Sequence, residues 1–254
     1  METLAAYLVA FATAQREGKK KLKLHDGDFS SADLSSIDLH GLTIQGTKVS
    51  PRQFYRAKFD NSNLLAATFV NVDLDDVSFK GANLSGAKFI GCLLVGADFT
   101  DATLSDVTFE NCRLGRAKLP NNIRAKFKNS RLVDLDLSGR DLRMSLFIGC
   151  SLWGTRFDNC DLRGSRFEGC DTGSKTFGFP NFGGADLWGA SMTLMSPLPV
   201  GMSSLTMGEV SYAAVRSSSG KINVWCEENE KWLSLDKAEL PEKVAAILAL
   251  MAEE

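Results

Sequence analysis

The sequence predicts a mainly β solenoid in which the chain turns a corner every five residues. A Leu or Phe occupies 17 of the 19 positions at steps of five from Phe29 to Leu119. After a shift of three residues, the same step runs from Phe127 to Leu187 with Leu or Phe at 12 of 13 positions. Small residues such as Ala and Cys stand two places before these large ones. Neither a helix (period 3.6) nor a simple strand (period 2) has this repeat.

The pattern is explained if the chain winds into square coils and each side of a coil consists of five residues. The large residue and the small one fill the shaft, the other three residues face water, and neighbouring coils pair at about 4.8 Å. Four sides to a coil give about eight coils. Phe and Leu alternate from Phe59 to Leu114, which predicts Phe on two opposite sides and Leu on the other two. The predicted core includes Phe59, Phe69, Phe79, Phe89, Phe99, Phe109, Leu84, Leu94, Leu104 and Leu114.

The recurring triplets "ADL", "ANL", "AKF" and "CDL" resemble those of the pentapeptide-repeat proteins. The resemblance covers residues 25–194 and implies a right-handed quadrilateral β-helix. It implies little about function, which varies across the family. Some relatives protect type II topoisomerases such as gyrase, and several dimerise through a C-terminal helix.

The N-terminal residues 1–24 are expected to form a capping helix and a basic connector. Leu4, Leu8 and Phe11 lie on one helical stripe that would cover the open end of the first coil. Within the repeats, residues 41–57 are interpreted as a distorted coil with a bulge, rather than a binding loop. The register slip at 120–126 suggests an exposed turn around Pro120, and the repeat degrades over residues 170–184.

Residues 195–254 lack the five-residue rhythm and are predicted to form a separate C-terminal module. Residues 195–208 are predicted to be a linker. Alternating residues around "SSSG" then indicate a β-hairpin, "KWLSL" suggests a third strand, and a helix is expected to start near Pro241. This module could be a cap with its own small core or a surface for a partner or a second copy. The candidate binding residues are Tyr212, Trp225, Trp232, Leu240, Val244, Ile247, Leu248 and Met251.

The sequence offers little support for catalysis, a metal site or a cofactor. The two histidines, His25 and His40, have no Cys or His at metal-ligand spacing, and the phosphate-binding and nucleophile motifs are absent. The predicted class is therefore not an enzyme, and no cofactor is expected. The six cysteines lack paired close spacing, and no run of residues is apolar enough to span a membrane. We expect reduced thiols, no membrane association and a cytoplasmic location.

Charge is unevenly distributed along the chain, although the net charge is only −2. Residues 59–110 carry a net of −6 and residues 113–166 a net of +7. The acidic candidates are Asp73, Asp75, Asp76, Asp98, Asp101, Asp106 and Glu110. The basic candidates are Arg113, Arg116, Arg124, Lys126, Lys128, Arg131, Arg156, Arg163 and Arg166. The imbalance is a chance feature of a soluble surface, or it marks a site for a charged partner or for pairing of two copies, acid end to basic end.

Three hypotheses about function follow. The leading one is a non-enzymatic scaffold that binds a protein partner. A second is a mimic of duplex DNA that modulates or protects gyrase, against which the basic half argues. The third is direct binding of nucleic acid through the basic half.

Overall fold

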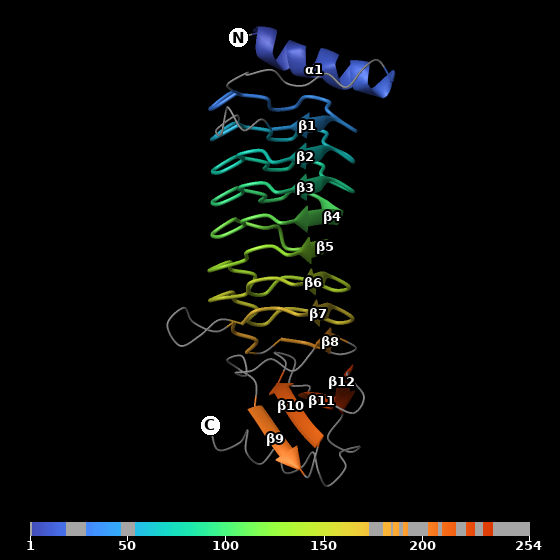
Figure 1. Ribbon diagram of the computed structural model, residues 1–254, viewed down its shortest axis with the longest axis vertical. Helices are drawn as coiled ribbons and strands as arrows, with labels where there is room; N and C mark the ends of the chain where they lie inside the picture. The colour runs from blue at the N-terminus through green and yellow to red at the C-terminus, as the bar shows by residue number, and fades with distance from the viewer. Residues whose placement is uncertain are drawn as a thin grey trace. The chain divides into compact units, whose positions relative to one another are not determined.

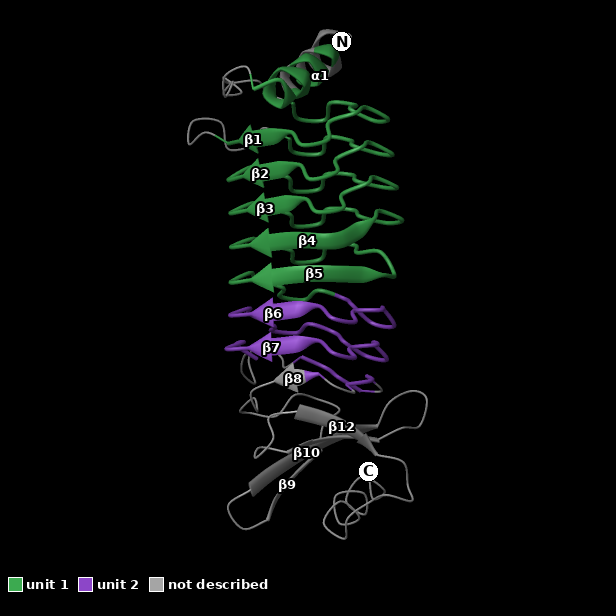
Figure 2. Ribbon diagram, turned by 90° about the vertical axis from the view of Figure 1, so that its right-hand side faces the viewer, with its two compact units in different colours: residues 1–135 green, residues 136–254 purple. Residues whose placement is uncertain are grey.

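The computed structural model describes most of the repeats and parts of the two ends. The described residues are 2–18, 29–46, 54–172, 180–183, 185–187, 190–192 and four strands between 203 and 235. The chain divides into two compact units, Met1–Leu135 and Asp136–Glu254 (Figure 2). Each unit is described by itself.

The first unit is a β-solenoid that begins with a helix. Helix α1 (Glu2–Arg16) precedes five short strands, which are β1 (Thr43–Gln45), β2 (Thr68–Val70), β3 (Lys88–Ile90), β4 (Leu104–Glu110) and β5 (Ile123–Lys128). The strands stack in parallel, one from each successive coil (Figure 1). Phe69, Phe89 and Phe109 are register partners, so one coil there consists of four five-residue repeats. The predicted solenoid fold is confirmed.

Backbone ladders define four sides of the first unit. For example, the N–H of Phe79 donates to the carbonyl of Asp98 at 2.8 Å, and the N–H of Phe99 donates to that of Lys118 at 2.7 Å. We name the sides by their inward residues, which are listed in chain order. Side A holds Ile44, Phe69, Phe89, Phe109 and Phe127, side B holds Phe29, Phe54, Leu74, Leu94, Leu114 and Leu132, side C holds Leu34, Phe59, Phe79, Phe99 and Leu119, and side D holds Leu39, Leu64, Leu84, Leu104 and Ile123.

The shaft of the first unit is filled by two columns of stacked Phe rings and two largely of Leu. All ten predicted core residues are buried. The rings of Phe89 and Phe109 stack at 5.1 Å with an interplanar angle of 10°, whereas Phe89 and Phe99 meet edge to face at 6.1 Å and 87°. Stacking therefore runs along sides A and C, and edge contacts join them across the shaft. Both geometries are favourable for aromatic pairs.

The corners between sides require a left-handed backbone. The second residue after an inward residue commonly has a φ between 50° and 72°. Gly, Asn and Asp adopt this region at least cost, which explains their frequency at these positions. A Cβ at Gly96 would also lie 2.4 Å from Oδ1 of Asp76 in the coil before, so the Asp76 side chain would have to move to admit one.

Two coils of the first unit depart from four full repeats. Ile44 pairs with Phe69, so this coil contains one repeat more; the extra segment, 47–53, lies outside the described residues. Phe109 pairs with Phe127, so that coil is shorter than four repeats. Ile123 takes the inward place beside Leu104, and the chain runs straight through one corner as the long strands β4 and β5. The slip thus consists of two sides that are each one residue short. The expected exposed turn is wrong for Pro120, which is buried, although Asn121 and Asn122 are exposed.

The second unit contains further coils and a separate antiparallel sheet. Strands β6 (Leu146–Ile148), β7 (Arg166–Glu168) and β8 (Ser191–Met192) stack in parallel. Strands β9 (Ser203–Met207), β10 (Val210–Arg216), β11 (Ile222–Cys226) and β12 (Lys231–Leu235) form the sheet in the order β12-β11-β10-β9. The strands expected on both sides of "SSSG" are β10 and β11, and "KWLSL" is β12. The linker expectation is wrong for residues 203–207, because β9 pairs with β10 there. The helix expected after Pro241 lies outside the described residues.

Helix α1 covers the first coil, as the apolar stripe predicts (Figures 1 and 2). Leu8 and Ala12 are fully buried. The side-chain amide of Gln15 donates to the carbonyl of Thr43 at 3.0 Å and accepts from its N–H at 2.7 Å. Gln15 therefore provides β1 with the donor and the acceptor that another strand would provide. Such pairing protects an exposed sheet edge.

We predict that Gln15→Ala lowers the free energy of unfolding by about 1 kcal/mol, because two hydrogen bonds to the β1 backbone are lost. Gln15→Glu should cost less, since a carboxylate still accepts from the N–H of Thr43. Urea unfolding followed by circular dichroism measures both values. Equal stability of the wild type and Gln15→Ala would show that the amide does not cap the edge.

Candidate interaction surface

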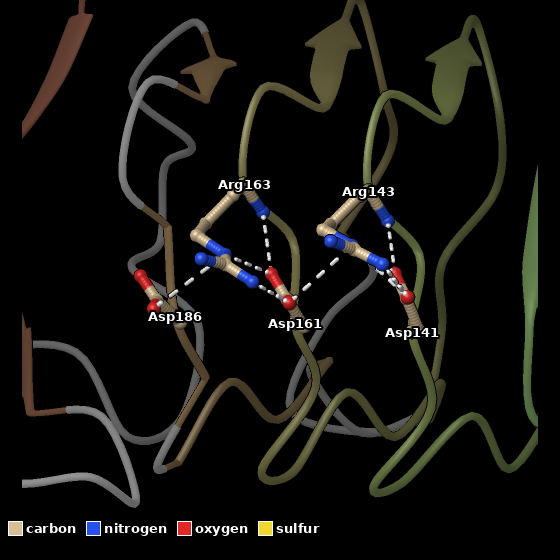
Figure 3. Close-up of polar contacts among 5 residues, drawn as sticks. All are labelled: Asp141, Arg143, Asp161, Arg163 and Asp186. Carbon is tan, nitrogen blue, oxygen red and sulfur yellow. Dashed lines mark hydrogen bonds and ion pairs between the residues drawn. The ribbon is translucent and has the colours of Figure 1, made fainter.

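A ladder of alternating Asp and Arg side chains lines one side of the second unit (Figure 3). Arg143 contacts Asp141 of its own coil at 2.5 Å and Asp161 of the next at 3.6 Å. Arg163 repeats the arrangement, with Asp161 at 2.5 Å and Asp186 at 3.9 Å. Each arginine thus joins two successive coils.

The sequence triplet Asp-Leu-Arg builds this ladder. Its Leu points into the shaft, and the residues on both sides of it point outward. The Asp carboxylate also accepts a hydrogen bond from the backbone N–H two residues later, at 3.1 Å for Asp141 and 3.2 Å for Asp161. Hydrogen bonding to Arg143 lowers the pKa of Asp141, and hydrogen bonding to Asp161 raises the pKa of Arg163.

The ladder should contribute stability at neutral pH that disappears in acid. Because the pKa of folded Asp141 lies below the ordinary value of 3.8, the contribution is present above that value and is lost as the pH falls through the folded pKa. These side chains are partly exposed, so we expect Asp141→Asn to cost about 0.5–1 kcal/mol at pH 7 and nothing near pH 2. Urea unfolding at both pH values measures this, with Asp101→Asn as a control. The same cost at both pH values would contradict the prediction.

Most of the basic candidates are paired with acids. In the first unit, Arg124 contacts Asp106 at 2.6 Å and Lys128 contacts Glu110 at 2.9 Å. In the second unit, ion pairs join Arg156 to Asp136 and Asp158, Arg163 to Asp161 and Asp186, and Arg166 to Glu168. Within the described part of the chain, the candidates that form no ion pair within 4 Å are Arg113, Arg116, Lys126 and Arg131.

The acidic candidates do not share one face. Asp73, Asp75 and Asp76 lie on side B, Asp98 and Asp101 lie on side C, and Glu110 lies on side A, with Asp106 at the bulge of β4. Asp98 contacts both Lys80 and Lys118 at 3.5 Å. Burial raises the pKa of Asp75, whose carboxylate accepts from the N–H of Val95 at 2.7 Å. Asp106 follows Leu104 of side D by two residues, so the acidic candidates are divided among all four sides.

On side B of the first unit, outward-facing charged side chains lie in the coils before and after one apolar coil, which contains Leu93 and Val95. We call this the side B surface. Its middle column, directly after the inward residues, contains Tyr55, Asp75, Val95, Gly115 and Val133, and the charge of Arg113 acts on Asp75. Two further outward columns lie on either side of it. The column before the inward residues contains Asp73, Leu93, Arg113 and Arg131, and the column at the corner contains Arg56, Asp76, Gly96, Arg116 and Asp134. Backbone bridges join Asp73 to Leu93, Leu93 to Arg113, and Arg113 to Arg131. Arg113 and Arg131 lie on opposite ends of the short coil, so they are 18 residues apart instead of 20. The same spacing makes Asp134 the next residue after Arg116 in the corner column.

The middle coil of this surface is apolar. Leu93 and Val95 are half-buried, while Arg56, Asp76, Arg113, Arg116 and Asp134 are exposed. The carboxylate of Asp76 is 3.8 Å from Nε of Arg56. Arg56 and Arg116 each have a φ of 58°, which bulky residues adopt at a cost. Ala66 and Met144 have similar φ values at other corners, so this backbone follows from the coil itself.

Several residues of this surface were missed by sequence reasoning, namely Arg56, Leu93, Val95 and Asp134. The step of four repeats that links positions 56, 76, 96 and 116 was a signal that could have found Arg56. Asp134 could not be placed without the length of the short coil, which the sequence gives only as a slip in the register.

The C-terminal candidates are placed only by backbone register. Tyr212, Trp225 and Trp232 lie in β10, β11 and β12, and Trp225 is the register partner of Trp232. Their side chains lie outside the described residues, as do Leu240, Val244, Ile247, Leu248 and Met251. Their role as a partner or dimer surface stays a prediction.

The comparison with protein families identifies the five-residue unit. Residues 62–122 match the family description "Pentapeptide repeat region", and residues 141–171 match "Pentapeptide repeats (8 copies)". These two segments of the solenoid are therefore pentapeptide repeats, in keeping with the resemblance that the sequence shows. No curated protein matches the chain.

Solved pentapeptide-repeat structures resemble the chain at low identity. HetL, involved in heterocyst differentiation regulation in the cyanobacterium Nostoc sp. strain PCC 7120, is 17% identical over 71% of this chain and 88% of its own, with a TM-score of 0.45. Full-length QnrB1, a plasmid-mediated fluoroquinolone resistance protein, is 18% identical over 66% and 90%, with a TM-score of 0.30. Rfr23 from the cyanobacterium Cyanothece 51142 is 17% identical over 58% and 90%, with a TM-score of 0.19.

The described residues contain neither a membrane-spanning helix nor a metal-binding cluster. No helix among them has the length and apolarity to cross a bilayer. No three His, Cys, Asp or Glu side chains among them are grouped so as to hold a metal ion.

Proposed function

We propose that the chain is a non-enzymatic scaffold that binds a protein partner through the side B surface of its first unit. The observation that carries the proposal is the contrast between this surface and the paired ladders. On the Asp–Arg ladder, each arginine contacts two carboxylates of its own chain. On the side B surface, Arg113 and Arg116 form no ion pair within 4 Å among the described residues, and they flank Leu93 and Val95.

This combination is favourable for association. Exposed charges steer a partner and set its register, while an apolar centre supplies area that is removed from water on binding.

A photoreactive amino acid tests the proposal in the native cell. Placed at Leu93, in the centre of the side B surface, it should form covalent products with a protein. Thr103 is the matched control, because it lies exposed on side D. Products at Leu93 and few at Thr103 are expected. No product at Leu93, or equal yields at both positions, would overturn the assignment of this surface.

DNA mimicry has less support. A mimic of a duplex needs carboxylates in rows along the solenoid, whereas these acids are divided among four sides and several contact Lys or Arg. Purified protein at micromolar concentration is therefore expected to leave the supercoiling activity of gyrase unchanged. Inhibition or protection would favour the mimic.

A further inference from the structure

We infer that the partner of the side B surface is a second copy of this chain, bound antiparallel. This inference rests on the proposed function and names the occupant of the same surface. The argument begins with the order of charges in the corner column. Arg56, Asp76, Gly96, Arg116 and Asp134 read plus, minus, neutral, plus, minus along successive coils. The signs on one side of Gly96 are opposite to those at equal distance on the other side.

Such an order is complementary to its own reverse. A two-fold axis that lies in the interface and runs along the Leu93–Gly96 coil inverts the order of coils and keeps the columns facing each other. Asp76 of one copy then faces Arg116 of its partner, and Arg56 faces Asp134. In the neighbouring column, Asp73 faces Arg113. Every such contact occurs twice, as in any isologous interface.

The apolar coil lies on the axis itself. Leu93 and Val95 meet their own counterparts there, so no charge faces a like charge at the centre. Gly96 has no side chain to separate the two copies at the corner. The middle of the interface would therefore be dry and apolar with charged pairs around it, which is the usual arrangement of a specific interface.

Other registers are unfavourable. An axis on the Asp76 coil sets Asp73 and Asp76 against themselves, and an axis on the Arg116 coil does the same to Arg113 and Arg116. The axis could instead lie midway between two coils. Between the Asp76 and Gly96 coils, it sets Arg56 of one copy against Arg116 of the other. Between the Gly96 and Arg116 coils, it sets Asp76 against Asp134. Parallel pairing exchanges the columns and sets Asp73 against Asp76. Like charges that face each other disfavour a pairing, so a single register is selected.

The expected dimer is weak and sensitive to salt. The surface is one side wide and five coils tall, roughly 20–25 Å at the spacing of paired strands. Such a face is small beside the roughly 800 Å² per partner of a stable interface, and small interfaces belong to transient complexes. We expect micromolar dissociation constants that rise when salt screens the exposed charges.

Charge exchange in purified full-length protein tests the inference. One variant carries Asp73→Arg and Asp76→Arg, and the other carries Arg113→Asp and Arg116→Asp. Both exchanges introduce residues already present in the same columns. By sedimentation velocity at low salt, the wild type should dimerise, and each variant alone should be monomeric. An equimolar mixture of the two should form a heterodimer, because all facing charges are again opposite.

A matched control separates the surface from net charge. Asp101→Arg makes the same change as Asp76→Arg at a similar corner on side C, where φ is 59° against 56°. We expect the Asp76 variant to weaken dimerisation at least tenfold and the Asp101 variant to leave it within twofold. Circular dichroism melting checks that each variant is folded.

Three results would overturn the inference. One is a wild type that stays monomeric at about 100 µM, well above the micromolar dissociation constant expected for this small interface. Another is a dimer that persists in both charge variants, which would place the contact elsewhere, for example in the C-terminal module. The third is a different protein as the partner of this surface. If Leu93 crosslinks to a different protein, the proposed function holds, but the partner is not a second copy of this chain.

Discussion

The free energy of unfolding is expected to fall by about 3–5 kcal/mol when Phe89 is replaced by Ala. The Phe89 ring stacks between Phe69 and Phe109, at 5.1 Å from each. It also meets Phe79 and Phe99 edge to face, at 5.9 and 6.1 Å. Truncation would remove four aromatic contacts and leave a cavity in the middle of the shaft, where the neighbouring coils cannot collapse without breaking their backbone ladders.

Urea unfolding followed by circular dichroism measures the loss. Phe89→Leu is the control, because Leu fills the equivalent inward place on sides B and D. We expect it to cost less than half as much as Phe89→Ala. A cost below about 1 kcal/mol for Phe89→Ala would show that the ring does not fill a closed core, since full truncation of a buried Phe costs several times more.

Ala87→Leu should cost about 1–3 kcal/mol or more, because the small inward place has no room for three further carbons. Ala87 is fully buried two residues before Phe89. The added side chain would push against the Phe stack or open the ladder between coils. Ala87→Leu adds no charge and no polar group, so a loss of stability reports on packing.

The control is Ala87→Cys. Cys92 and Cys112 fill the same kind of place and are buried with their thiols donating to backbone carbonyls. Ala87→Cys is therefore expected to stay within about 0.5–1 kcal/mol of the wild type, in keeping with small changes of volume. If Leu were as well tolerated as Cys in thermal melting, the small positions would not be tight.

The sequence was sufficient to predict the solenoid because every side repeats the same local rule. A large inward residue, a small one two places earlier and a corner residue fit for positive φ recur whatever the neighbouring coils contain. Where that rule changes, prediction is weaker. The place of Ile123 depends on how the chain from Leu119 to Phe127 is divided into two sides, and backbone pairing with Leu104 decides it. The cap formed by Gln15 depends on a helix meeting Thr43, which lies 28 residues away.

The candidate surface could be predicted only in part, because residues that follow one another in the sequence lie on different sides of the solenoid. Residues from 59 to 110 sum to a negative charge, yet coiling distributes Asp73, Asp98 and Glu110 over three sides. The contrast between paired and unpaired charges emerges only from the stacking of long, regular and short coils. Arg124 finds Asp106 because the short coil brings them together, whereas Arg113 lies opposite Arg131.

Scalar couplings across hydrogen bonds in the deuterated protein test the five-residue square coil most directly. The structure predicts a coupling from the amide of Phe79 to the carbonyl of Asp98 and one from Phe99 to Lys118, each reaching into the next coil. Phe59 should couple to Ser78 in the same way. Couplings to carbonyls four residues earlier would indicate helix instead, and freely exchanging amides at these three phenylalanines would contradict the coil altogether.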